Sequence, residues 1–280
     1  MTHMKYSWIF GLLGLFMLSS CEDYVDIEIP QQEKRIVAYS FISPQDTVIQ
    51  VFVGNSLPLF AGSQNIQFEP ELINATVRLS DGINEIIIPF NTQTLNFEYS
   101  TSDYPIVSGT TYTLTIEVEG YETVTAQTTV PMQTPHFTST ELMLLHEGSS
   151  NGFEPQDKYA IDMKWNDIAG TENYYSVNIF STYGEYTNAD ARYYYTDKDA
   201  DGTTLSRRAE TYSYYYPEGG IEPSFRIYLL NVNKDYYLYH RSIQNITYGD
   251  PFSEPSMVYT NFENGLGCFG AFNGSSVLLD

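Results

Sequence analysis

Residues 74–89 read NATVRLSDGINEIIIP and contain the pattern that decides the fold. Ala75, Val77 and Leu79 alternate with polar residues, which is the period of a β-strand with one buried face. The Asp81-Gly82 pair then predicts a tight turn into a second strand over 85–89. The segment therefore predicts a β-hairpin that packs one face against a core.

Short strands of the same kind lie on both sides of this hairpin. The pattern predicts strands over 35–42 and 47–53 before it, and over 112–118 and 122–130 after it. About seven strands in a hundred residues, with turns at this spacing, are typical of a β-sandwich. We therefore expect an immunoglobulin-like β-sandwich over residues 35–132.

A second β-rich domain is predicted over 136–280, with Pro131 and Pro135 marking the boundary. A polar loop separates the first two of its strands, and a hairpin is predicted between 193–196 and 203–207. The predicted strands of this domain are 138–145, 159–165, 173–183 and 224–232.

One short helix is predicted near 234–245. Asn233 is a suitable N-cap residue. The residues that recur at helical spacing after it are Tyr236, Tyr239, His240 and Ile243. The expected fold is thus mainly β, with two sandwich domains and one short helix.

The N-terminal residues resemble a processing signal rather than part of a fold. Residues 8–18 are uncharged and apolar, a run too short to span a bilayer, and Leu18-Ser19-Ser20-Cys21 resembles a bacterial lipobox. We expect a lipoprotein signal peptide over 1–20, lipidation of Cys21, and a lipidated tether over 21–34. An ordinary secretory signal with an incidental cysteine is the alternative.

The chain is strongly acidic because it has few bases. It carries 35 Asp and Glu against 13 Lys and Arg, a formal charge of −22, and 42% of its residues are hydrophobic. The excess of acidic residues argues against nucleic-acid binding, which needs a clustered basic face. The hydrophobic fraction predicts a buried core. Residues 36–157 hold 14 acids and one base, whereas 158–280 hold 16 acids and nine bases. The second region is therefore the better candidate for contact with a partner.

Asp197, Asp199, Asp201 and Gly202 form the sharpest chemical motif. Carboxylates at alternate positions can converge on one hard cation, so the motif predicts a candidate Ca²⁺ site. An EF-hand would place Glu at position 12, where this chain has Arg208. A polar loop without metal is the alternative, and no other cofactor is expected.

Tyrosine is concentrated in the second region, where 18 of the 25 tyrosines lie between residues 159 and 259. In a run of three on a strand, rings face both sides. Such rings suit a half-buried sheet, and they also suit a surface for a partner or ligand. The candidate partner-surface residues are Tyr193, Tyr194, Tyr195, Tyr214, Tyr215 and Tyr216.

The sequence supports three further predictions, for Thr47, for Cys268 and for the glycines around Cys268. Thr47 follows Asp46 and precedes Val48, a pattern that resembles an O-glycosylation acceptor in Bacteroidetes. Cys268 lies in an apolar stretch and is expected to be a buried thiol. The glycines around it match G-x-G-x-x-G without room for a following helix, so close packing of a terminal strand is expected rather than nucleotide binding.

Five segments together resemble a Bacteroidetes outer-membrane lipoprotein family of unknown function, domain of unknown function 4249. Members often carry Ile where Cys268 stands. The segments are Cys21–Pro30 (CEDYVDIEIP), Asn55–Phe60 (NSLPLF), Val107–Tyr112 (VSGTTY), Asp250–Pro255 (DPFSEP) and Asn261–Gly270 (NFENGLGCFG).

The resemblance implies an outer-membrane lipoprotein that is often encoded beside a TonB-dependent receptor, and it implies no catalytic residues. Glu22 and Asp23 resemble the signal that exports such lipoproteins to the cell surface, with a periplasm-facing protein as the alternative. We therefore expect a non-enzymatic accessory or ligand-binding partner of a TonB-dependent transporter. An adhesin or surface-assembly component is the alternative function.

Overall fold

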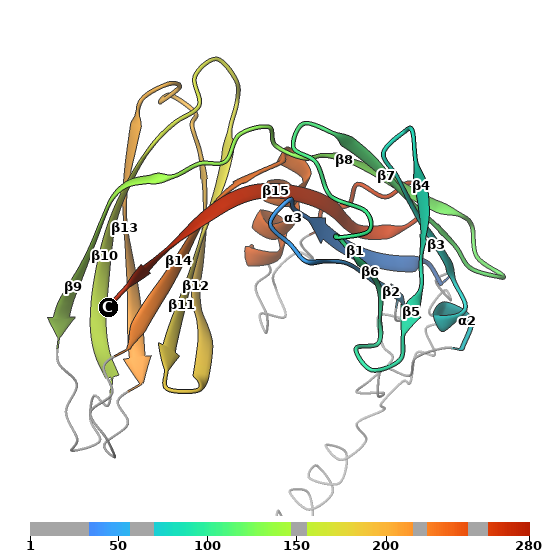
Figure 1. Ribbon diagram of the computed structural model, residues 1–280, viewed down its shortest axis with the longest axis horizontal. Helices are drawn as coiled ribbons and strands as arrows, with labels where there is room; N and C mark the ends of the chain where they lie inside the picture. Colours follow the sequence, from blue (N-terminus) through green and yellow to red (C-terminus); the bar gives the residue numbers. More distant parts are fainter. Residues whose placement is uncertain (1–33, 57–69, 147–155, 215–222, 246–256) are drawn as a thin grey trace, which may run out of the picture. The chain divides into compact units, whose positions relative to one another are not determined.

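The computed structural model describes residues 34–56, 70–146, 156–214, 223–245 and 257–280 (Figure 1). It is mainly β, with sheets in a sandwich-like arrangement, as predicted. Within these ranges no helix is both long and apolar enough to cross a membrane. The predicted signal peptide, Cys21 and nearly all of the tether lie outside them.

The first core lies between a four-stranded sheet and part of an eight-stranded sheet. Val51, Leu79 and Leu114 are fully buried in it. Their alternation with less buried neighbours is the pattern predicted for half-buried strands. The four-stranded sheet has the order β4 (Glu85–Ile88), β3 (Thr76–Ser80), β7 (Thr111–Glu117) and β8 (Val124–Thr129). The other sheet contributes β1 (Ile36–Ile42), β2 (Val48–Asn55), β6 (Asn96–Ser100) and β5 (Phe90–Asn91).

The second core lies between a three-stranded sheet and the remaining part of the eight-stranded sheet. Trp165, Tyr175 and Phe225 are its largest fully buried side chains. The three-stranded sheet has the order β13 (Thr204–Tyr214), β10 (Gln156–Asn166) and β9 (Phe137–His146). Facing it are β12 (Tyr186–Thr196), β11 (Tyr174–Tyr183), β14 (Ser224–Val232) and β15 (Leu266–Leu279).

The last strand, β15, takes part in both sandwiches. Residues 266–271 pair in parallel with β1, and residues 272–279 pair antiparallel with β14. Phe262, Phe269 and Ala271 thus join the first core although they lie near the end of the sequence. The division into domains at 35–132 and 136–280 stays a prediction, but the first core draws residues from both ranges.

Gly267 allows β15 to lie directly against β1. Its φ is +109°, and a Cβ atom there would overlap the carbonyl oxygen of Ala38. Only glycine fits a position that combines this backbone conformation with so close an approach. The expectation that these glycines pack a terminal strand is confirmed.

The predicted helix is confirmed as α3 (Lys234–Gln244), and its N-cap Asn233 joins three elements. Asn233 Oδ1 accepts from the backbone amide of Tyr236 at 3.2 Å and from that of Ala271 at 3.0 Å. Its Nδ2 donates to Thr128 Oγ1 at 3.0 Å. One side chain therefore ties the helix to β15 and β8.

The hairpin predicted between 193–196 and 203–207 is wrong. β12 pairs with β11 and β13 pairs with β10, so the chain between them crosses from one sheet to the other. Turns at Ala200 and Thr203 make this crossing. The sequence pattern also missed the short β5–β6 hairpin and the one-turn helix α2 (Pro70–Ile73).

We expect Gly267→Ala to lower the free energy of unfolding by at least about 3 kcal/mol, because it adds backbone overlap to an unfavourable φ. Gly120→Ala is the matched control: Gly120 also has a positive φ, +82°, but no atom lies within 4 Å of the place that a Cβ would occupy. This control should cost about 1–2 kcal/mol. Urea denaturation measures both values, and equal costs would refute the role given to the close approach.

Candidate binding face

The structure brings together two of the three predicted metal-binding aspartates. Carboxylate oxygens of Asp167, Asp197 and Asp201 all lie within 4.8 Å of one another. Asp199 is not in this cluster, and its φ of 69° turns the loop at that point. Sequence reasoning missed Asp167, because it lies 30 residues before Asp197 and joins it only through the fold.

Asp167 holds the crossing loop in place by accepting two hydrogen bonds. Its Oδ1 accepts from the hydroxyl of Tyr175 at 2.7 Å, and its Oδ2 accepts from the amide of Gly202 at 2.8 Å. Buried acceptors that are satisfied in this way stabilise a loop without any metal.

The other two aspartates have similar partners. Asp197 Oδ2 accepts from the amide of Asn173 at 2.8 Å, and Asp201 Oδ1 accepts from the amide of Gly170 at 2.7 Å. The cluster thus fastens the loop 197–203 to the turn before β11. This arrangement explains the motif as a structural one, and the Ca²⁺ site stays a prediction.

The tyrosines of β12 face both sides of the sheet, as predicted. Tyr194 stacks on His240 with ring centroids 5.5 Å apart. Tyr195 lies on the opposite side, against Trp165 at 5.9 Å, and the hydroxyl of Tyr193 donates to the carbonyl of Glu210 at 3.1 Å. All three rings are half-buried and contribute to packing. Their role as a partner surface stays a prediction.

The remaining predicted residues are placed as follows. Tyr214 ends β13, whereas Tyr215 and Tyr216 lie outside the described residues. Thr47 is exposed in the loop between β1 and β2, where its glycosylation stays a prediction. Cys268 is fully buried, as predicted, and burial raises the pKa of its thiol.

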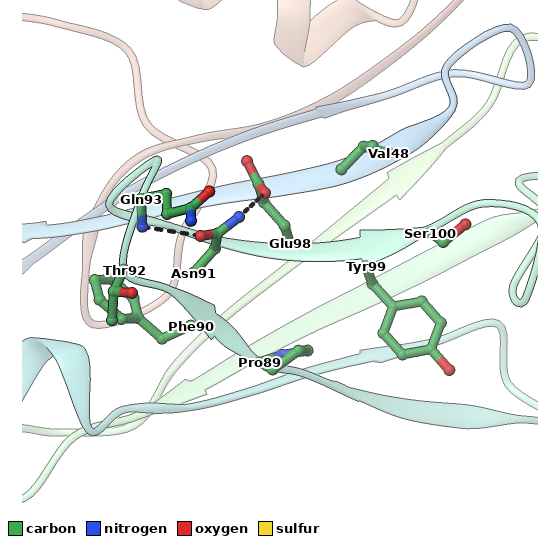
Figure 2. A pocket seen from close by; sticks show the side chains of 9 residues that line it. All are labelled: Val48, Pro89, Phe90, Asn91, Thr92, Gln93, Glu98, Tyr99 and Ser100. Carbon is green, nitrogen blue, oxygen red and sulfur yellow. Dashed lines mark hydrogen bonds between the residues drawn. The ribbon is translucent and has the colours of Figure 1, made fainter.

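An open hollow of about 480 Å³ lies beside the β5–β6 hairpin (Figure 2). Its one carboxylate, Glu98, accepts from Asn91 Nδ2 at 2.7 Å and from Gln50 Nε2 at 2.9 Å. These hydrogen bonds hold the pKa of Glu98 below its ordinary value. Because the Glu98 carboxylate is already hydrogen-bonded to neighbouring side chains of the sheet, we do not assign the hollow a reactive role.

A more distinctive surface is the outer face of β12, β11, β14 and β15. Helix α3 covers one end of this face, where Tyr236 packs with Tyr174, Leu230 and Val232. The rest of the face lies beyond the helix. It is therefore an ordered, partly covered sheet surface on the second region.

Five residues lie on this part of the sheet, which we call the arginine face: Asn178, Phe180, Arg192, Arg226 and Tyr228. Asn178 pairs with Arg192 on one side and with Tyr228 on the other, and Phe180 pairs with Arg226. Both arginines are exposed, whereas the alternate residues of β11 and β14 are buried in the second core. The register thus places one arginine on each side of β11, Arg192 beside Asn178 and Arg226 beside Phe180.

A pocket of about 310 Å³ lies between this face and the end of α3. Phe180 and Arg192 line it from the sheet, and His240 and Ile243 line it from the helix. Burial, with a smaller contribution from Arg192, lowers the pKa of His240 to about 4. His240 is therefore neutral near pH 7, and Arg192 supplies the pocket's positive charge.

Sequence reasoning missed the arginine face. The alternation in Ser224–Val232 (SFRIYLLNV) places Arg226 and Tyr228 on one side of a strand, but the relation to Arg192 depends on the pairing of three strands. The triple tyrosine runs were the stronger sequence signal, although they mark packing positions as well.

Comparison with known proteins assigns the chain to a protein family. The model of a family described as a domain of unknown function (DUF4249) matches residues 22–276, which is nearly the whole chain. A search of curated proteins found no match.

We expect Asp167→Asn to lower the free energy of unfolding by about 1–3 kcal/mol, measured in EDTA so that no metal contributes. The asparagine NH₂ group would face a second donor, such as the Gly202 N–H, and one of the two hydrogen bonds would be lost. Asp199→Asn is the matched control, since Asp199 lies outside the cluster and asparagine tolerates its positive φ. It should change stability little. Thermal unfolding measures both, and a large rise in the wild-type Tm with millimolar Ca²⁺ would instead identify a cation site.

Proposed function

The chain belongs to the DUF4249 family of domains of unknown function, and we propose that it is a non-enzymatic, lipid-anchored protein of the outer membrane. It faces the cell exterior and acts as an accessory or ligand-binding partner of a TonB-dependent transporter. The lipobox-like Cys21 and the acidic residues after it support the location. Acyl chains on that cysteine would provide the anchor.

The observation that carries the binding role is the arginine face. Its two arginines are exposed, it lies on paired strands, and it adjoins a pocket, which are features of a preformed binding site. The most compact titratable cluster, around Asp167, is instead bonded to its own loops. The chemistry of the described residues therefore favours binding over catalysis.

An adhesin or surface-assembly component is the second candidate, and strand β9 favours it. β9 is ten residues long and lies at the edge of its sheet. Leu144 and Leu145 are about half exposed on it, at 51% and 46%. A long edge strand with exposed apolar side chains can pair with another chain.

Affinity purification of the tagged, full-length protein from outer membranes in mild detergent should recover a TonB-dependent β-barrel. The matched control is Cys21→Ser, which removes the acyl acceptor. This variant should no longer fractionate with the outer membrane, and its purification should no longer recover the β-barrel. Recovery of free lipoprotein alone would contradict the transporter role. Loss of attachment in a deletion strain, with nutrient uptake intact, would favour the second candidate.

A further inference from the structure

We propose that the arginine face binds an acidic saccharide, with sugar carboxylates on Arg192 and Arg226 and a sugar ring on Phe180. This inference rests on the proposed role as a binding protein and specifies its ligand class. Three features of the face carry it: its charge, its ring and amide groups, and its position on the sheet.

The charge of the face is opposite to that of the chain. The protein has a formal charge of −22, yet the outward positions of β11 and β14, and their partners on β12, hold two arginines and no carboxylate. Asp190, at the bulge of β12, is the one acidic residue lining the adjoining pocket, and its Oδ1 accepts from Ser181 Oγ at 2.8 Å. Neither Arg192 nor Arg226 forms an ion pair within the described ranges. By contrast, Arg208 is paired with Asp162 at 2.6 Å. Two guanidinium groups without a carboxylate partner are suited to a ligand with carboxylates, which they can bind through paired hydrogen bonds.

The ring and the amide between the arginines are fixed in position. Phe180 is half-buried and packs edge-on against Tyr228, with centroids 5.6 Å apart. Asn178 is 8% exposed, and its Oδ1 accepts from Ser176 Oγ at 3.0 Å. Its Nδ2 donates to no group that the structure describes, so this donor is left for a ligand. An apolar ring surface beside a free amide suits the mixed apolar and hydroxyl surface of a sugar.

The position of the face favours a saccharide over an acidic peptide. Its floor consists of side chains from strands that are already paired on both sides, β11 and β14. A peptide lying over this floor would find no strand edge for its backbone groups, which are costly to leave unpaired. A peptide paired with the edge strand β12 would lie in the plane of the sheet and away from Phe180. A sugar can keep its outer hydroxyls in water, and the pocket of about 310 Å³ has room for one or two rings.

Isothermal titration of the full-length, lipidated protein in detergent tests the inference with trigalacturonate as the probe. We expect saturable binding that is at least about tenfold weaker for galactotriose, which lacks the carboxylates. Arg192→Gln and Arg226→Gln should each weaken trigalacturonate binding at least about tenfold. Lys198→Gln is the matched control, because it removes an exposed cation from a loop outside the face and should leave affinity unchanged.

Three results would overturn the inference. They are no saturable binding of trigalacturonate, equal affinity in the arginine variants and the wild type, and tighter binding of triglutamate than of trigalacturonate. The last result would identify a peptide site instead.

The titration tests the saccharide inference independently of the purification that tests the transporter role. If a β-barrel copurifies but trigalacturonate does not bind, the saccharide inference alone fails. If trigalacturonate binds but no barrel is recovered, the transporter partnership alone fails.

Discussion

The structure depends on the pairing of strand β15 with two different strands. Its first half lies in parallel beside β1 and its second half lies antiparallel beside β14. The parallel half requires the backbone of Gly267 to approach the carbonyl of Ala38 more closely than any side chain would permit. Because one continuous strand completes sheets over both cores, each core depends on residues from the end of the chain.

The same strand fixes the surroundings of the arginine face. The backbone amide of Ala271 on β15 donates to Asn233, which also begins helix α3. The helix then covers one end of the outer sheet face and leaves the other end open beside His240. The pocket therefore lies between elements that hydrogen bonds and core packing hold together, which favours binding without a large rearrangement. The structure thus combines an acidic chain with a face on paired strands that holds two exposed arginines.

The local features of the fold could be predicted from the sequence. Alternation in 74–80 identified a strand, and Asn233 with Tyr236 and Tyr239 identified the helix, because both signals come from neighbouring residues. The predicted pairing of 193–196 with 203–207 was wrong because a short polar loop can join strands of two sheets as readily as strands of one. Closeness in sequence alone does not show whether two strands pair with each other or belong to different sheets.

The candidate sites show the same limit. Asp197 and Asp201 could be predicted from their motif, whereas Asp167 joins them through the end of β10. The arginine face needs the register of β12, β11 and β14, so no single segment reveals it. Cys268 was predictable as a buried thiol because the apolar residues around it are its neighbours in sequence.

Native-state hydrogen exchange along β15 tests most directly whether this strand joins the two sandwiches into one cooperative unit. The account predicts that amides bonded to β1 and amides bonded to β14 exchange with the same free energy, equal to that of global unfolding. If amides in 272–279 exchanged through an opening several kcal/mol lower in free energy than those in 266–271, or the reverse, the two sandwiches would unfold separately and the central role of β15 would be contradicted.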